Sequence, residues 1–193
     1  MKRSEGTADL KMANPNFPVF DRHGNLFVSN SGDYWNLNPG DGNIMVIRPD
    51  NTTELFHKGP FKFANGLAID PDHNYLYIAQ TSAFNVVRIP LDHPNGFIEV
   101  VYQLPEHTLV DGLCFTADGQ LLMSCYRPDK CFLGQQNGSI EVFVNDVSAE
   151  LLISPTNCAL HEGKIYFANL GGWHISVMET KLQASPIYRP ELS

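Results

Sequence analysis

The chain has 193 residues, a length typical of one domain with a substantial buried core. Hydrophobic residues make up 43% and charged residues 18%, as in a globular protein and unlike a disordered chain. Thirteen basic against 21 acidic side chains give a formal net charge of −8. This balance argues against nucleic acid or an anionic membrane as the partner, because phosphate binding needs clustered Lys and Arg.

Two further classes are disfavoured by the distribution of apolar residues. The sequence has no run of about 18 apolar residues, so we expect no membrane-spanning helix. The charged start of the chain is not followed by an apolar segment, so we expect no secretory signal and a cytoplasmic protein.

The cysteines are spaced without a CxxC pattern and without a paired histidine, so a structural zinc site is disfavoured. In a reducing compartment, we expect them to be small buried side chains, with a Cys125–Cys131 disulfide as the alternative. The four cysteines are Cys114, Cys125, Cys131 and Cys158.

An internal repeat is the most informative feature of the sequence. Four segments, over 16–30, 65–80, 111–125 and 157–169, each open with Asn or Asp and continue as a short apolar stretch. A turn rich in Asp, Gly and Asn follows, and then a second apolar stretch. The segments recur every 46 to 49 residues, which is typical of an array of equivalent units.

Each unit is predicted to be a small antiparallel sheet. The four segments have the pattern of β-hairpins. Alternating stretches over 43–48, 85–90 and 139–144 predict third strands, and stretches over 54–57, 97–102 and 149–153 predict fourth strands in the first three units. No segment shows sustained helical periodicity. Four antiparallel strands in each repeat of about 46 residues are typical of a β-propeller blade.

The sequence therefore predicts an all-β protein, a β-propeller of four-stranded antiparallel blades. We expect a single domain over residues 1–193 with about four blades, the repeats starting near positions 16, 65, 111 and 157. Four blades can close a ring, but the chain begins shortly before its first predicted inner strand. Because an open ring exposes two sheet edges, we also expect that this is an incomplete six-bladed ring.

The residues that open the repeats suggest a functional site. The first residues of the innermost strands crowd around one mouth of a propeller channel. Asn16, Asn65, Asp111 and Asn157 occupy this position in successive units. Their amide and carboxylate oxygens are ligands that Ca²⁺ accepts. The alternative is that Asn and Asp start these strands because they cap backbone groups and tolerate turns.

Other motifs carry weaker signals. Asp70-Pro-Asp72 begins like a calcium-binding loop, but the later positions do not match, so it is interpreted as a hairpin turn. The aromatic residues Trp35, Tyr126 and Trp173, and also His174, are candidates for a pocket wall or for packing. The Gly-x-Ser-x-Gly motif of serine esterases is absent.

Several of these motifs resemble the SMP-30/gluconolactonase family. The resemblance rests on the sequences at 63–72, 76–80, 110–114, 155–157 and 170–174, among them Asn65-Gly-Leu and Asp111-Gly-Leu, in the family's order. It implies a six-bladed propeller with one divalent metal in the channel. Calcium is the expected ion, with Zn²⁺, Mn²⁺ or Mg²⁺ as alternatives. It also implies hydrolysis of sugar lactones or related esters.

Site residues follow from the resemblance position by position. Asn16, Asn65 and Asp111 match metal ligands of the family, although Phe17 stands where an Asp usually follows the first of them. Asp111 also matches the proposed general base. Asn157 matches a residue that contacts substrate or water, and His174 and Tyr126 are added as expected substrate contacts.

The family's remaining metal ligand, a glutamate of its first blade, has no match here. Glu5 lies in a polar segment without the apolar strand that normally surrounds that residue. The resemblance therefore implies that about two blades are missing at the N-terminus. Two functions stay open: a metal-dependent lactone or ester hydrolase acting on a small molecule, and a non-catalytic propeller fragment or pseudoenzyme that serves as a binding or scaffold module. One carboxylate with neutral amides would hold Ca²⁺ weakly.

Overall fold

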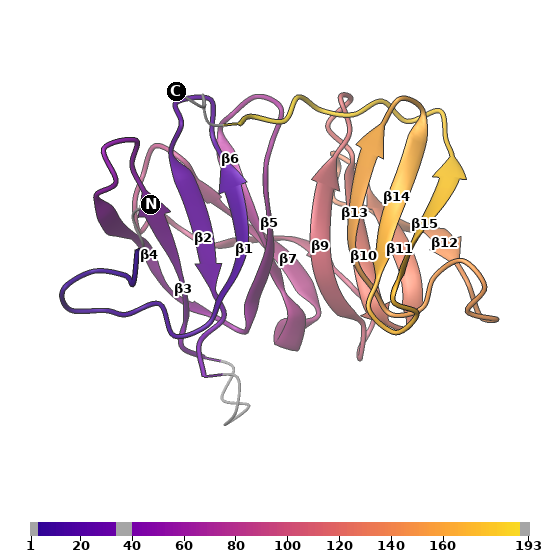
Figure 1. The fold of residues 1–193 in the computed structure, drawn as a ribbon, viewed down its shortest axis with the longest axis horizontal. Coiled ribbons are helices and arrows are strands. Elements are labelled where there is room, and N and C mark those ends of the chain that lie inside the picture. The colour runs from indigo at the N-terminus through magenta and orange to yellow at the C-terminus, as the bar shows by residue number, and fades with distance from the viewer. Residues whose placement is uncertain (1–3, 34–39, 190–193) are drawn as a thin grey trace.

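The computed structural model describes residues 4–33 and 40–189, and it consists of β-strands joined by short turns (Figure 1). A single short 3₁₀ helix, Thr81–Ala83, is found in this part of the chain. The strands are β1 (Pro15–Phe20), β2 (Leu26–Asn30), β3 (Gly42–Ile47), β4 (Thr53–Phe61), β5 (Ala64–Ile69), β6 (Tyr75–Gln80), β7 (Asn85–Pro90), β8 (Glu99–Gln103), β9 (Leu109–Phe115), β10 (Leu121–Arg127), β11 (Asp129–Gly134), β12 (Ile140–Asn145), β13 (Pro155–His161), β14 (Lys164–Asn169) and β15 (His174–Glu179).

These strands form four antiparallel sheets in chain order, which we call blades 1 to 4. Blades 1, 2 and 3 contain β1–β4, β5–β8 and β9–β12, and blade 4 contains β13–β15. The inner strands β1, β5, β9 and β13 pack against one another in succession. The predicted all-β propeller with four blades is therefore confirmed. The last sheet has three strands, and it is the unit for which the sequence pattern predicted no fourth strand.

Blade 3 differs in detail from its prediction. Its third strand is β11, over residues that the sequence pattern did not single out, and β12 is its fourth strand. The connection between β10 and β11 is a tight turn at Arg127-Pro128 that pairs Tyr126 with Asp129, and it lacks the Asn-Gly or Asp-Gly signal typical of two-residue hairpin turns. The predicted strand over 149–153 is wrong. In that segment the N–H groups of Leu151 and Leu152 donate to the Asp146 carboxylate instead of to a sheet.

Apolar clusters between neighbouring blades hold the fold together. Phe27 of blade 1 packs in one cluster with Ile78 of blade 2, and Tyr77 of blade 2 packs in another with Leu121 of blade 3. A third cluster joins blades 3 and 4. Burying a large apolar side chain contributes about 1.5–3 kcal/mol, so the three clusters fix the angular order of the inner strands.

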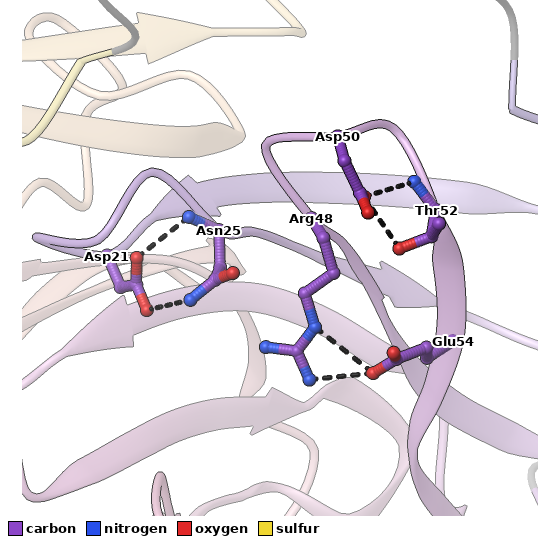
Figure 2. A network of polar contacts seen from close by, with 6 residues as sticks. All are labelled: Asp21, Asn25, Arg48, Asp50, Thr52 and Glu54. Atoms are coloured by element: carbon purple, nitrogen blue, oxygen red, sulfur yellow. Dashed lines mark hydrogen bonds and ion pairs between the residues drawn. The ribbon is translucent and has the colours of Figure 1, made fainter.

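Polar groups shape the turns at the outer ends of the hairpins. In blade 1 the Asp21 carboxylate accepts hydrogen bonds from the backbone and the side chain of Asn25, which closes the β1–β2 turn (Figure 2). Arg48 and Glu54 form an ion pair of 2.7 Å across the β3–β4 hairpin. Both side chains of this pair are partly exposed, so the pair contributes little to stability.

One face of blade 4 is apolar and open to solvent. Leu170, Trp173, Ile175 and Val177 are 66%, 94%, 68% and 47% exposed. Within the described part of the chain, no helix has the length and apolar character needed to cross a membrane.

Candidate functional site

The four residues that open the repeats lie at equivalent places on the inner strands. Asn16 and Asn65 are the second residues of β1 and β5, and Asp111 and Asn157 are the third residues of β9 and β13. In each of these four strands the pairing with the next strand is irregular next to this residue. The repeat therefore places one polar side chain from each blade at the same end of the arrangement.

Glycines bring three of these strands close together. A methyl group at Gly66 would clash with the backbone oxygen of Asp111. A methyl group at Gly112 would meet the side-chain oxygen of Asn157 in the same way. Glycine is thus required directly after Asn65 and directly after Asp111, because the neighbouring inner strand passes so close at both positions. The structure therefore places Asn65, Asp111 and Asn157 on three adjacent inner strands that approach closely at these residues.

A hydroxyl group ties each of the first two blades to its successor. Ser31, next after β2, accepts a hydrogen bond of 3.0 Å from the Asn16 amide and donates one of 2.8 Å to the carbonyl oxygen of Ala64. Thr81, next after β6, accepts 3.1 Å from the Asn65 amide and donates 2.7 Å to the carbonyl oxygen of Val110. Ser31 therefore donates to the residue before Asn65 in blade 2, and Thr81 donates to the residue before Asp111 in blade 3.

This pattern fixes the orientation of the Asn65 amide. A hydroxyl has one hydrogen to donate, and Thr81 gives it to the Val110 carbonyl, which can only accept. Asn65 must therefore present its NH₂ group to Thr81, which turns Oδ1 the other way. Oδ1 of Asn65 is buried and has no hydrogen-bond partner. An unpaired buried oxygen is costly, and a bound cation would satisfy it.

Asp111 lies next to this amide and has an unusual pKa. Burial raises the pKa of Asp111 to about 7, and a hydrogen bond with the side chain of Asn65 acts in the opposite direction. A carboxylate buried without a positive partner favours its neutral form unless a cation or a donor compensates it. At neutral pH this carboxyl group can therefore both take up and release a proton.

The donor set fits a hard divalent cation in its chemistry. It offers the unpaired oxygen of Asn65 and the carboxylate of Asp111, and Ca²⁺ prefers ligands of both kinds. Among the described residues, no group of three or more His, Cys, Asp or Glu side chains could hold a metal. A cation at this place would therefore depend on amide oxygens and water beside one carboxylate.

The other two opening residues are positioned differently. The side-chain oxygen of Asn157 accepts a hydrogen bond of 2.8 Å from the N–H of Cys158, and it lies against Gly112. Asn16 is exposed and is held by Ser31. The structure thus gathers Asn65, Asp111 and Asn157, and leaves Asn16 at the solvent-facing end of the succession.

Tyr126 and His174 lie at the same end of their blades as these residues. Tyr126 is half-buried near the end of β10, opposite the start of β9. His174 begins β15, two strands out from β13, and is exposed, with Nδ1 3.0 Å from the carbonyl oxygen of Gly172. Neither residue lies on an inner strand. Both therefore remain predicted substrate contacts, at the rim of the candidate site.

Three further expectations have simple outcomes. Trp173 is 94% exposed, and Trp35 lies outside the described residues. Glu5 lies in the N-terminal segment beside Thr53 on the outer part of blade 1, and not on an inner strand. The turn after Asp70 is the predicted hairpin turn, since its carboxylate accepts the N–H groups of Asn74 and Tyr75.

All four cysteines are free, so the alternative of a disulfide between Cys125 and Cys131 is wrong. In the ladder Cys125 lies opposite Lys130, and Cys131 lies opposite Ser124. Burial raises the pKa of the Cys114 thiol to about 12, as expected for an apolar side chain that is not a nucleophile.

Sequence reasoning missed Ser31 and Thr81. Both follow directly after the second strand of a hairpin, one residue beyond the ends of the repeat segments over 16–30 and 65–80. Extending the repeat segments by one position would have placed a hydroxyl residue in units one and two, and Tyr126 in unit three. A single matching position is a weak sequence signal, and the role of Ser31 and Thr81 is seen only in their hydrogen bonds to the next blade.

The family model described as SMP-30/Gluconolactonase/LRE-like region matches residues 4–164. The chain belongs to this family. Among curated proteins, the lactonase drp35 of Staphylococcus aureus is 25% identical over 125 residues, which are 62% of this chain and 38% of that protein. This member of the SMP-30/gluconolactonase family thus spans well under half the length of that lactonase.

Solved structures with a similar fold support the propeller architecture of this chain. A gluconolactonase from Xanthomonas campestris superposes with a TM-score of 0.74 at 16% identity, covering 93% of this chain and 60% of that one. Regucalcin from Agrobacterium tumefaciens, described as a calcium-binding protein, gives a TM-score of 0.71 at 16% identity, covering 91% and 65%. At these identities the likeness shows the propeller architecture.

Proposed function

We propose that the chain is a metal-dependent hydrolase of lactones or related esters, with its site at the Asn65, Asp111 and Asn157 end of the inner strands. The observation that carries the proposal is the proximity of a buried, unpartnered Asn65 oxygen to the half-buried carboxyl group of Asp111, whose pKa is raised. The family supports the proposal, because its name and the names of its relatives include gluconolactonase and lactonase.

Each residue has a role that its contacts support. Asn65 and Asp111 would hold one divalent cation, Ca²⁺ first and Zn²⁺, Mn²⁺ or Mg²⁺ as alternatives. When bound, such a cation polarises the ester carbonyl as a Lewis acid. Asp111 accepts the proton of the attacking water as the general base. Thr81 keeps the Asn65 oxygen turned away from its own hydroxyl, and Asn157 offers an amide to orient the substrate.

A hydrolysis assay with a panel of lactones and divalent ions tests this function. We expect metal-dependent turnover by the wild-type chain, and a loss of about 100-fold or more in Asp111→Asn, since general-base catalysis contributes roughly 10²–10⁴-fold. Asp118→Asn, in an exposed turn, is the matched control and should keep full turnover. Equal turnover by Asp111→Asn and wild type would contradict the assignment.

A second function has an observation of its own. The expected cation site has one carboxylate, and no acidic residue of the described inner-strand starts adds a second. Since Ca²⁺ affinity rises with ligand charge, the chain could instead be a non-catalytic propeller that binds a small molecule or serves as a scaffold. Ligand binding without turnover under any metal in the same assay would support this function.

A further inference from the structure

A cavity of about 360 Å³ lies between the four inner strands, beyond the polar residues described above. This volume lies within the range of about 300–1,000 Å³ typical of small-molecule sites. Its lining includes apolar side chains from all four blades and from the C-terminal segment. They are Phe17, Val19, Leu67, Leu113, Leu160 and Ile187.

The C-terminal segment closes one end of this cavity. It leaves blade 4, passes the ends of β13 and β9, and continues toward blade 2 (Figure 1). Ala184 forms a β-bridge with Thr116, and the N–H of Ser185 donates to the carbonyl oxygen of Phe115. The ring of Tyr188 then meets the ring of His73 edge-on, with 4.7 Å between their centroids. Ile187 lines the cavity and is still 68% exposed, so the segment is a floor with access from solvent.

The polar groups around the cavity are few and mostly engaged. The Asp70 carboxylate accepts two backbone N–H groups of its own turn, and burial lowers the pKa of His73, which favours the neutral form of its ring. None of the described residues that line the cavity is Lys or Arg. The interior therefore offers no positive charge to an anionic ligand and few free partners for the hydroxyl groups of a sugar.

The cavity is continuous with the candidate catalytic residues through Asn157. This residue lines the cavity, and its side-chain oxygen lies against Gly112, the neighbour of Asp111. A molecule whose polar end lies at Asn157 could therefore extend an apolar tail between the inner strands toward the C-terminal floor.

We propose that this cavity binds a hydrocarbon chain, and that the substrate is a lactone or ester carrying an alkyl side chain and not a polyhydroxylated sugar lactone. The identification of the ligand as a substrate rests on the proposed function, whereas the binding of a hydrocarbon chain does not. Burial of each methylene in such a site tightens binding about three- to four-fold.

Calorimetric binding of a homologous series tests the proposal. The ligands are γ-lactones with side chains of increasing length, from γ-butyrolactone to γ-decanolactone, and 1-octanol as a chain without a lactone. We expect affinity to rise about three- to four-fold for each added CH₂ until the cavity is filled. Ala184→Trp, which fills the floor, should abolish this rise, and Ala168→Trp, an exposed alanine on the open face of blade 4, should not.

A second variant guards against misfolding. Ile187→Asp places a charge in the lining at an exposed position of the floor, so it should fold with an unchanged melting temperature and lose the dependence on chain length. Affinity that is independent of chain length in wild type would overturn the proposal, even if short lactones are hydrolysed and the proposed function stands. Binding of 1-octanol that is lost in Ala184→Trp, without binding of any lactone, would support the hydrocarbon site and contradict the proposed function.

Discussion

The hydroxyl group of Thr81 lies between Asn65 and Val110, accepting from the amide of the first and donating to the carbonyl of the second. It therefore joins blade 2 to blade 3 at the residue before Asp111. Ser31 makes the same connection one blade earlier, between Asn16 and Ala64. Each hydroxyl group thus holds the polar residue of one blade in a fixed position relative to the polar residue of the next blade.

Removing the hydroxyl group of Thr81 should cost stability. Thr81→Val leaves the buried Val110 carbonyl and the Asn65 amide without this partner, and we expect a loss of about 1–3 kcal/mol in the free energy of unfolding. Thr81→Ser keeps the hydroxyl and should lose less than Thr81→Val. Urea denaturation measures both, and a loss in Thr81→Ser as large as that in Thr81→Val would contradict the prediction, because the hydroxyl would then contribute no more than the methyl group.

Asp111 should make the stability of the metal-free protein fall as pH rises. Its pKa in the folded chain, about 7, is above the ordinary value of 3.8, so the folded state binds the proton more tightly. The contribution is fully present below pH 3.8 and is lost as pH rises through about 7.

We therefore expect Asp111→Asn to become more stable than wild type between about pH 4 and pH 7, since the amide stays neutral. Chemical denaturation in the presence of a chelator, at several pH values, measures the difference. A difference between the two proteins that does not grow with pH would show that Asp111 is not held in a neutral state by burial.

The close approach of β5 and β9 requires glycine at position 66. An added methyl group in Gly66→Ala would meet the backbone oxygen of Asp111, and overpacking of this kind typically costs about 1–3 kcal/mol or more. Gly24→Ala is the comparison, since its position has a positive φ of 80° but only an ordinary contact with Pro49.

We expect the Gly24→Ala change to cost about 1 kcal/mol, the ordinary penalty for a left-handed conformation without a clash. Thermal or urea unfolding compares the two variants. If Gly66→Ala were tolerated better than Gly24→Ala, β5 and β9 would be further apart than the structure shows.

The open face of blade 4 should tolerate truncation. Trp173 is 94% exposed, so we expect Trp173→Ala to change the free energy of unfolding by no more than about 0.5 kcal/mol. Phe167→Ala, in the same blade but fully buried, should cost about 3–5 kcal/mol. A large loss in Trp173→Ala would mean that this face is covered in solution.

The sequence predicted the repeat, the blade architecture and the residues that open each inner strand, because hairpins depend on local alternation and turn residues. It misplaced two strands of blade 3, where β10 and β11 meet at Arg127-Pro128 without a Gly or Asn signal. It also could not find Ser31 and Thr81, because their role depends on carbonyl groups about 30 residues away in the next blade. The cavity floor at 184–188 was missed for the same reason, since its partners Phe115 and His73 are distant in the sequence.

The central claim is that the oxygens of Asn65 and Asp111 form a cation site. Calorimetric titration of Ca²⁺ into the wild-type chain, Asn65→Leu, Asp111→Asn and the control Asp118→Asn tests it most directly. We predict saturable binding by wild type and by Asp118→Asn, and a loss of at least ten-fold in affinity in each of the other two variants. Heats equal to those of the buffer for the wild-type chain, or binding that survives both substitutions, would contradict the account.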